Sequence, residues 1–258
     1  MRKILFWAMC ALLFTAQSFA AAPEPGTESY SYYVDVNSTG ASAPYGSWAT
    51  AAVNIDTVLS YIIANRATGD TKCIYVAPGI GGDVNARIRF LDVEVSNTTS
   101  TGALGASAQD ASESVRDSVI FQVPAASNQH GVISDADADG LMLLNLTIAV
   151  EAAGRYALNI VESDGFTARN IVIKGVAPQS SHLSYFNGVN NLYLSRVIGR
   201  VTAAATAYNY IELAGATNGT ISFCSFSSPS IAYRGVNTNS TGTVNIYNSV
   251  FFDYNFKK

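Results

Sequence analysis

The hydrophobic pattern of this chain repeats in five short stretches between Asp139 and Phe252. Each stretch opens on a small polar turn, alternates apolar and other residues for about four positions, and meets a polar residue before a second apolar strand. The stretches are DGLMLLNLTI (Asp139–Ile148), DGFTARNIVI (Asp164–Ile173), NNLYLSRVIG (Asn190–Gly199), NGTISFCSFS (Asn218–Ser227) and TGTVNIYNSVF (Thr241–Phe251). The polar residue of each stretch is Asn145, Asn170, Arg196, Ser225 and Asn248 in turn. A period of this size, built from strands with no helical stretch between them, predicts a stacked solenoid.

The chain before the repeats predicts a strand and then a helix. Tyr32 to Val36 alternates like a strand. Apolar residues then fall on one face at helical spacing, at Ala51, Ile55, Val58, Leu59 and Ile62. Ser47 is the expected N-cap, and Gly69 follows the expected helix end. We expect this helix to cover the apolar cross-section and the unpaired strand edges of the first coil.

Further strands and one long aperiodic segment lie between the helix and the repeats. Lys72 to Gly79 is typical of a strand ended by a Pro-Gly turn, Arg87 to Val95 of a strand pair, and Val119 to Val123 of a strand. Ser96 to Ser118 is rich in Ser, Thr, Ala and Gly and has no period. A loop of this length is either functional or a plain excursion from one coil, and the sequence leaves both interpretations open.

The first residues predict an export signal. Residues 1–20 combine two basic residues, an apolar run too short to span a bilayer, and small residues at a cleavage site. We expect cleavage after Ala20, with Ala22 as the alternative; a lipoprotein at Cys10 and an uncleaved anchor fit the pattern less well. Residues 21–31 have the composition of a linker. Residues 32–258 form one expected domain, with an N-terminal cap at 32–72 and coils at 73–258.

The charge balance limits the kinds of partner that this protein can bind. The 258 residues are 48% hydrophobic and only 13% charged, which excludes a disordered chain. Loss of residues 1–20 leaves 13 basic and 19 acidic residues, a net charge of −6 (13 − 19), and this argues against a nucleic-acid partner. No later segment has the length of a transmembrane helix. We expect a secreted protein, outside the cell or on its surface, with the periplasm as the alternative.

The mature chain keeps two cysteines, Cys73 and Cys224. They lie about five or six coils apart, which is roughly 25 Å at about 4.8 Å per coil. Because that separation is far beyond disulfide reach, we expect two buried thiols that form no disulfide.

Two segments near the N-terminus resemble a known family. YYVDVNSTGASAPYGSWATAAVNI (Tyr32–Ile55), followed by IYVAPG (Ile74–Gly79), resembles the N-terminal cap of exported bacterial right-handed parallel β-helix proteins of the pectin-lyase-like class. The resemblance implies an all-β, right-handed parallel β-helix solenoid with an N-terminal amphipathic capping helix. It does not imply one activity, because that class holds lyases, hydrolases, epimerases, adhesins and proteins of no known activity.

The resemblance also implies three short strands per coil. In the coil from Arg155 to His182 we place them at Ala157 to Glu162, Phe166 to Arg169 and Ile171 to Lys174. The residues expected to face the core are Leu158, Ile160, Phe166, Ile171 and Ile173. The polar residues Asn145, Asn170 and Asn248 would share one buried bend and stack as an amide ladder, which Arg196 and Ser225 interrupt.

The family's polysaccharide groove lies along the first strand of each coil. Aligning the coils there gives an outward column of His130 or its neighbours, Asn159, Tyr185, Glu212 and Arg234, with Arg155, Tyr208, Tyr210 and Tyr233 at its margins. Aromatic rings, amides, acids and Arg suit a sugar chain. The alternative is an ordinary solvated face, and the pattern favours neither.

Asp135, Asp137 and Asp139 alternate before Gly140, as at the start of a calcium loop. Leu146 stands where an EF-hand would place its Glu, so an EF-hand is excluded. A simpler Ca²⁺ site on a coil turn remains a hypothesis beside an acidic, solvated turn. Ca²⁺ is the one candidate cofactor.

Two enzyme chemistries are conceivable. In a lyase, Arg155 or Arg234 would act as base beside a cation; in a hydrolase, Glu212 would pair with Glu162 or Asp164. Neither constellation is specific, so lyase-type cleavage stays a hypothesis.

Our leading interpretation is recognition of an extracellular polysaccharide or surface glycan. The alternative is a non-catalytic adhesion or structural scaffold. The last repeat has no capping element in the sequence after it, which predicts self-association through the C-terminal coil, a partner docked there, or a truncated member of a longer family.

Overall fold

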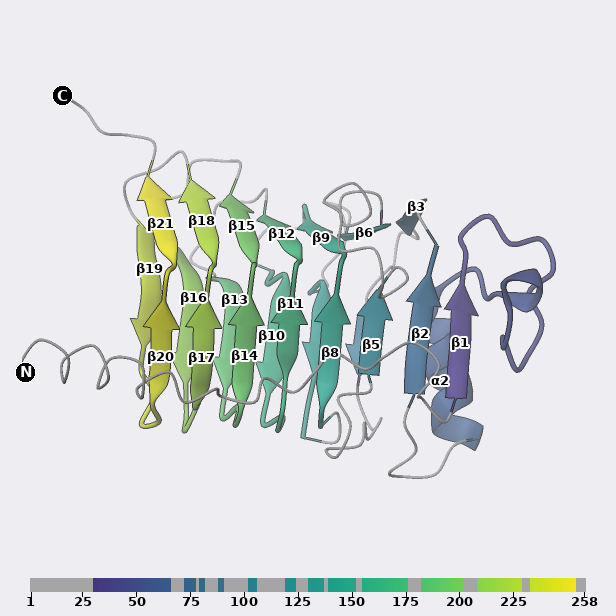
Figure 1. Ribbon diagram of the computed structural model, residues 1–258, viewed down its shortest axis with the longest axis horizontal. Coiled ribbons are helices and arrows are strands. Elements are labelled where there is room, and N and C mark those ends of the chain that lie inside the picture. Colours follow the sequence, from purple (N-terminus) through teal and green to yellow (C-terminus); the bar gives the residue numbers. More distant parts are fainter. Residues whose placement is uncertain are drawn as a thin grey trace, which may run out of the picture.

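The strands of the chain wind into a parallel β-solenoid made of three sheets (Figure 1). The structure is a computed structural model, and it describes residues 30–65, 72–77, 79–81, 88–90, 102–105, 119–123, 130–136, 139–151, 155–175, 182–201, 208–228 and 233–253. The predicted signal peptide at residues 1–20, Gly69, Asp137 and most of Ser96 to Ser118 therefore lie outside the described residues.

Each complete coil contributes one strand to each of the three sheets. Sheet A contains β1 (Tyr30–Val34), β2 (Lys72–Val76), β5 (Gly102–Gly105), β8 (Leu141–Leu144), β11 (Thr167–Arg169), β14 (Leu192–Ser195), β17 (Gly219–Ser222) and β20 (Val244–Tyr247). Sheet B contains β3 (Gly79–Gly81), β6 (Val119–Val123), β9 (Thr147–Val150), β12 (Val172–Gly175), β15 (Ile198–Val201), β18 (Ser225–Ser228) and β21 (Val250–Asp253). Sheet C contains β4 (Ile88–Phe90), β7 (Val132–Ser134), β10 (Leu158–Val161), β13 (His182–Asn187), β16 (Tyr208–Ala214) and β19 (Tyr233–Thr238).

This architecture confirms the predicted parallel β-helix. The coil of β10, β11 and β12 has its three strands where the sequence placed them, and every pairing between named strands is parallel. Side chains alternate inward and outward, so the core consists of columns along the solenoid axis. The five residues expected in the core of this coil are all at most 1% exposed.

Three boundaries differ from the sequence prediction. The first strand begins at Tyr30, inside the expected linker, and ends at Val34. Strand β5 lies within the segment interpreted as an aperiodic loop, because Gly and Ala dilute its pattern. The N-cap of the helix α2 (Ile55–Asn65) is Asn54, whose Oδ1 accepts hydrogen bonds from the Thr57 N–H at 2.9 Å and Oγ1 at 2.7 Å. Ser47 instead precedes the short helix η1 (Trp48–Thr50).

Helix α2 covers the N-terminal end of the core, as expected (Figure 1). Its buried residues Ile55, Val58, Leu59 and Ile62 belong to the same hydrophobic cluster as Tyr32 of β1. The backbone of β1 is also satisfied on its outer edge: Tyr33 N–H donates to the Tyr45 carbonyl, and Ala52 N–H donates to the Tyr33 carbonyl, both at 2.9 Å. The cap therefore covers apolar surface and a strand edge together.

Left-handed residues turn each coil from sheet A to sheet B. They are Asn145 (φ 54°), Asn170 (φ 53°), Arg196 (φ 54°), Phe223 (φ 53°) and Asn248 (φ 48°). The predicted bend at Ser225 was wrong, because a Phe in this conformation breaks the rule that favours Asn there. With Phe223 at the bend, the interval from each bend to the next is nearly constant, whereas Ser225 made one interval too long and the next too short.

The amide ladder at this bend has two members among the described residues. Asn170 Nδ2 donates to Asn145 Oδ1 at 2.7 Å, and Asn145 is only 6% exposed. Asn248 is exposed and lies beyond Arg196 and Phe223 along the column, so it does not extend the ladder. Left-handed backbone is therefore the feature that all five bends share, and the amide bond is local to one pair.

Replacing Asn170 should separate these two contributions. We expect Asn170→Leu to lower the free energy of unfolding by about 1–3 kcal/mol, because it loses the amide bond and strains the left-handed backbone. Asn170→Gly keeps the backbone conformation and should cost less. Chemical denaturation measures both, and an unchanged stability of Asn170→Leu would rule out a structural role for this bend.

The two cysteines are buried and form no disulfide, as predicted. Cys73 lies in a small cluster with Met142 and Leu144, apart from the main core. Cys224 lies in the main core, and burial raises the pKa of its thiol to about 11. A raised pKa does not activate the Cys224 thiol as a nucleophile.

Two hydroxyl groups break the apolar pattern of sheet C. Ser134 Oγ and Ser184 Oγ are buried and have no hydrogen-bond partner among the residues that the structure describes. Their register neighbours include the core residues Ile160 and Leu158, so these two hydroxyls face the core. Thr217, by contrast, is equally buried and donates to the Ala214 carbonyl at 2.7 Å.

Ser184→Ala should therefore stabilise the protein. Removing an unpaired buried hydroxyl should raise the free energy of unfolding by about 1 kcal/mol. The matched variant Thr217→Val removes a hydroxyl that has partners and should lower it by about 1–3 kcal/mol. Thermal and chemical denaturation test the pair, and destabilisation by Ser184→Ala would contradict the unpaired assignment.

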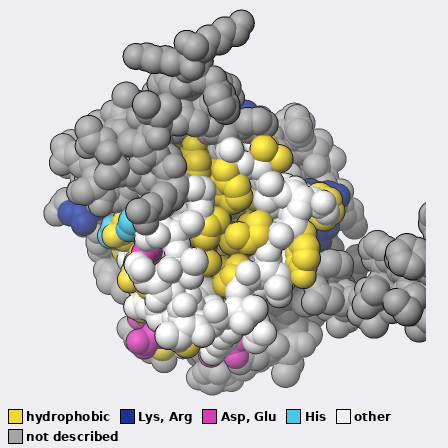
Figure 2. Space-filling model, turned by 90° about the vertical axis from the view of Figure 1, so that its left-hand side faces the viewer, with side chains coloured by type: hydrophobic (Ala, Val, Ile, Leu, Met, Phe, Trp, Pro, Cys, Tyr) yellow, Lys and Arg dark blue, Asp and Glu magenta, His cyan; other side chains and the backbone are white. Residues whose placement is uncertain are grey.

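The C-terminal end of the solenoid shows its core residues to solvent. On sheet A the inward column contains Leu143, Ala168, Leu194, Ile221 and Ile246. The first four are at most 1% exposed, whereas Ile246 in the last coil is 44% exposed. Figure 2 shows apolar side chains in the middle of this end, with polar groups around them.

Candidate functional site

The outer face of sheet C carries the predicted column of outward side chains, but the residues at its two ends differ from those predicted. Asn159, Tyr185 and Glu212 are register partners, as the alignment predicted. The column continues to Ile133 on one side and to Asn237 on the other. His130 precedes β7, and Arg234 pairs with Asn209 instead, so neither belongs to this column.

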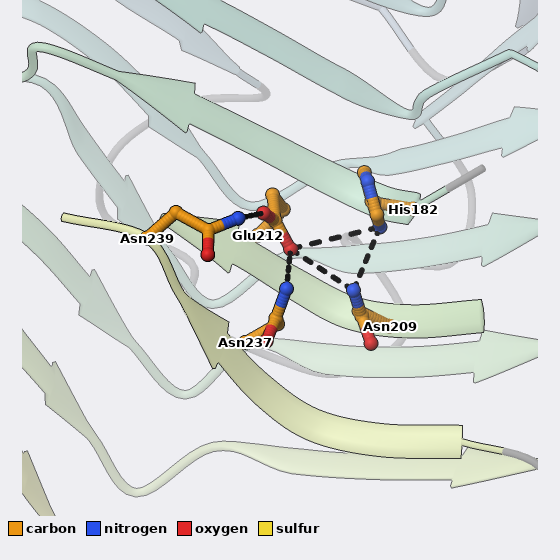
Figure 3. Close-up of polar contacts among 5 residues, drawn as sticks. All are labelled: His182, Asn209, Glu212, Asn237 and Asn239. Carbon is orange, nitrogen blue, oxygen red and sulfur yellow. Dashed lines mark hydrogen bonds and ion pairs between the residues drawn. The ribbon is translucent and has the colours of Figure 1, made fainter. Parts of the chain in front are cut away.

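Glu212 is the centre of a polar cluster at the C-terminal half of this face (Figure 3). Its Oε2 accepts hydrogen bonds from Asn209 Nδ2 at 2.9 Å and from Asn237 Nδ2 at 2.7 Å. Its Oε1 accepts one from Asn239 Nδ2 at 2.7 Å. His182 Nδ1 lies 3.9 Å from Oε2. The sequence prediction of an outward Glu212 holds for its register, but the side chain is only 5% exposed.

The amide donors explain how a carboxylate can be buried here. Burial of an unpaired carboxylate would be costly, and hydrogen bonds to the charged form offset that cost. Two neighbouring coils supply the donors. Asn209 lies on β16, the strand of Glu212 itself. Asn237 lies near the end of β19, and Asn239 lies in the turn after it. Each of these amides contributes an N–H group, which is the part of an amide that can donate to a carboxylate.

Aromatic rings form a second feature of the face, beside Glu212. The rings of His130 and Tyr156 stack at 4.6 Å between centroids and 17° between planes, and those of Tyr156 and His182 at 5.9 Å and 16°. Tyr185 stacks on Tyr156 at 5.5 Å and 21°. We call His130, Tyr156, His182 and Tyr185 the ring ladder. Its members lie face to face, so the polar atoms at their ring edges are the groups left for other contacts.

Protonation in the ring ladder follows from burial. Burial, and then the positive charge of Arg155, lower the pKa of His130 to about 4. Burial also lowers the pKa of His182, although the Glu212 carboxylate opposes the shift. Burial, with smaller effects of Tyr185 and Glu212, raises the pKa of Tyr156 against the opposing Arg155. At neutral pH both imidazoles and this phenol are therefore uncharged.

The hydrogen bonds then fix which ring nitrogen carries the proton. His130 Nδ1 accepts from the Tyr156 backbone N–H at 2.8 Å, so its proton lies on Nε2. Asn209 Nδ2 lies 3.1 Å from His182 Nδ1 and 2.9 Å from Glu212 Oε2, so its two protons serve both acceptors. His182 then also carries its proton on Nε2. The ladder thus offers N–H and O–H donors from successive coils.

The other predicted site residues lie in the core, beside the ring ladder, or where the structure does not describe their side chains. Tyr210 is 2% exposed and packs on Phe226 at 5.5 Å in the core, so its assignment to a sugar surface was wrong. Tyr208 and Tyr233 are register partners in sheet C, but their side chains and that of Arg234 are outside the described part. Arg155 lies beside the ring ladder, as its effect on His130 shows.

The predicted calcium turn has a structural use at one of its carboxylates. Asp139 Oδ1 accepts from the Asp164 backbone N–H at 2.6 Å and so links neighbouring coils. Asp135 lies on the same turn, and Asp137 is outside the described residues. Within the ranges that the structure describes, no three His, Cys, Asp or Glu residues come together in a way that could hold a metal ion.

The sequence prediction named His130, Tyr185 and Glu212 but missed Tyr156 and His182 of the ring ladder and the amide partners of Glu212. His130, Tyr156 and His182 follow one another at equal intervals of one coil, and this interval is a signal that the sequence contains. Asn209, Asn237 and Asn239 carry no comparable signal, because their roles depend on the register between β16 and β19.

Comparison with models of protein families, with curated proteins and with solved structures finds no match to this chain. Among the described residues, no helix has both the length and the apolar character needed to cross a membrane.

Acid should destabilise the fold through His130. Its pKa is depressed in the folded state, so the unfolded chain binds the proton first as the pH falls. The stabilisation is complete above about pH 6.5 and is lost between there and about pH 4. We expect His130→Phe, which cannot titrate, to flatten the fall in melting temperature over this range. Identical pH profiles for the variant and the parent would show that His130 is not held neutral.

Proposed function

We propose that this protein recognises a polysaccharide outside the cell through the outer face of sheet C, and that it is an exported β-helix protein of the pectin-lyase-like class. The observation that carries the proposal is the ring ladder beside the Glu212 cluster, which gives one face uncharged N–H and O–H groups from successive coils. A sugar chain carries hydroxyl groups along its length, and each hydroxyl both donates and accepts.

The proposed contacts are hydrogen bonds at ring edges. The faces between neighbouring rings pack on one another, so the ring edges are the groups that recur along this surface. The Tyr156 phenol keeps its proton because its pKa is raised, and it can therefore donate to a sugar oxygen. Coils repeat at about 4.8 Å, so such donors recur at short, regular intervals along the axis.

The face supports binding better than cleavage. A general base needs a lone pair that points at the substrate proton, and both oxygens of Glu212 already accept amide N–H groups. This argues against Glu212 as a hydrolase carboxylate. Lyase-type cleavage by Arg155 or Arg234 with Ca²⁺ is a separate hypothesis that the proposal does not include. A non-catalytic adhesion or structural scaffold is the second candidate, and the same closed Glu212 network favours it.

Two conservative substitutions test the ring-edge contacts. Tyr156→Phe with Tyr185→Phe keeps the ladder but removes two hydroxyls, and we expect it to weaken polysaccharide binding by about 5- to 100-fold, at about 0.5–1.5 kcal/mol per hydrogen bond. Tyr193→Phe, on the outer face of sheet A, is the matched control and should bind like the parent. Titration calorimetry with a panel of acidic and neutral polysaccharides measures the affinities.

Two outcomes of this experiment would contradict the proposal. If the parent protein binds none of the polysaccharides in the panel, the result would favour the scaffold. Full binding by the Tyr156/Tyr185 variant would show that the hydroxyls make no contact. Cleavage is tested by incubating the protein with the same panel, with and without Ca²⁺. Absorbance then detects unsaturated products, and a reducing-end assay detects hydrolysis.

A further inference from the structure

We propose that the C-terminal end of the solenoid binds the same end of a second copy, so that the protein forms a closed, twofold dimer. The end is defined by β19, β20 and β21, which are the last described strands of the three sheets. Each is paired with a described strand on one side only. This inference is independent of the polysaccharide proposal, because it concerns a different surface.

The inward side chains of this end are those that another layer would cover. Val236, Ile246 and Phe251 are register partners of Ile211, Ile221 and Phe226. The three residues in the preceding coil are 0% exposed, whereas Ile246 is 44% exposed and the other two are partly buried. The exposed group is therefore the cross-section of the core, and solvent is an unfavourable neighbour for it.

The charge pattern favours a second copy as the occupant. No Asp, Glu, Lys, Arg or His occurs between Gly235 and Phe252, and the polar residues there are mainly Ser, Thr and Asn. In Figure 2 the charged side chains of the described residues lie toward the rim of this end, away from its apolar middle. Of the strands that define this end, β19 also contains the basic residue Arg234 and β21 ends at the acidic residue Asp253, so their formal charges cancel. Two identical surfaces repel when they carry a net charge. Its electrostatics therefore permit self-pairing, which a net-charged patch would oppose.

The opposite end of the solenoid excludes a head-to-tail arrangement. Helix α2 covers the apolar cross-section there, and hydrogen bonds from Tyr33, Asp35 and Ala52 occupy the outer edge of β1. An open C-terminal end therefore finds no matching N-terminal end on another copy. The remaining contact between copies is isologous, and an isologous contact closes at two subunits instead of growing into fibres.

A twofold axis at this junction would place the last strands of the two copies antiparallel. Antiparallel strands can exchange backbone hydrogen bonds as parallel strands do, so the open edges gain partners. The apolar side chains of the two last coils then cover each other. One contact would therefore cover both the exposed apolar surface and the open strand edges.

Sedimentation velocity of the full chain over a concentration series tests the proposal. We expect a mass of two copies that raising the salt concentration does not reduce, because the proposed contact is made by apolar side chains and backbone hydrogen bonds and not by ion pairs. Ile246→Lys puts like charges at the junction and should halve the mass. Tyr247→Lys is the matched control: it lies next to Ile246 on β20, is 50% exposed and faces the outside of sheet A, so the mass should stay at two copies.

A parent protein that stays at one copy throughout the series would overturn the proposal, and would favour coverage of this end by residues 254–258 or by another protein. Masses that grow beyond two copies would overturn the closed arrangement. Hydrogen exchange on the parent provides a test that needs no variant, in case Ile246→Lys fails to fold. Amides of β20 and β21 should exchange more slowly as concentration rises, while those of β1 should not change; equal behaviour would contradict the proposal.

Discussion

Parallel stacking of short strands in register is the constraint on which the rest of the structure depends. A strand of three to seven residues is not stable alone, and here each interior strand obtains its backbone hydrogen bonds from the coils before and after it. The stack persists only if each coil turns at the same place. Left-handed residues at the bend between sheets A and B, from Asn145 to Asn248, fix that place. Regular corners thus keep the inward columns apolar and the outward columns aligned.

The same register assembles the candidate site. Glu212 gains its amide partners because β19 pairs with β16 so that Asn237 lies beside it. Tyr156 meets His130 and His182 because each coil repeats the previous one along the axis. Such a face is rigid, and its polar groups are held by backbone pairing more than by side-chain packing. Recognition of an extended, repeating ligand suits a surface of this kind, whereas chemistry at one point would need groups that converge.

The fold was predictable because its signals are local and repeated. Alternation within a strand and a polar or left-handed corner in every coil are visible in the sequence, and only Phe223 at its corner misled the alignment. The site was predictable in part. Asn159, Tyr185 and Glu212 were placed correctly because they share one position in the coil. The contact of Asn239 with Glu212 and the burial of Tyr210 were not predicted. Both depend on the local geometry of β16 and β19, which no pattern along the chain indicates.

The most direct test of this account is a disulfide across the register of sheet C. Asn159 and Tyr185 are paired, half-buried and outward, so Cys at both positions should lie within bonding distance. Cys73 and Cys224 are buried and should not compete. Val161 also faces outward but is two positions out of register with Tyr185, roughly 8 Å away. Mass spectrometry after mild oxidation should find a bridge in the 159/185 pair and none in the 161/185 pair; the reverse would show that the coils are stacked in another register.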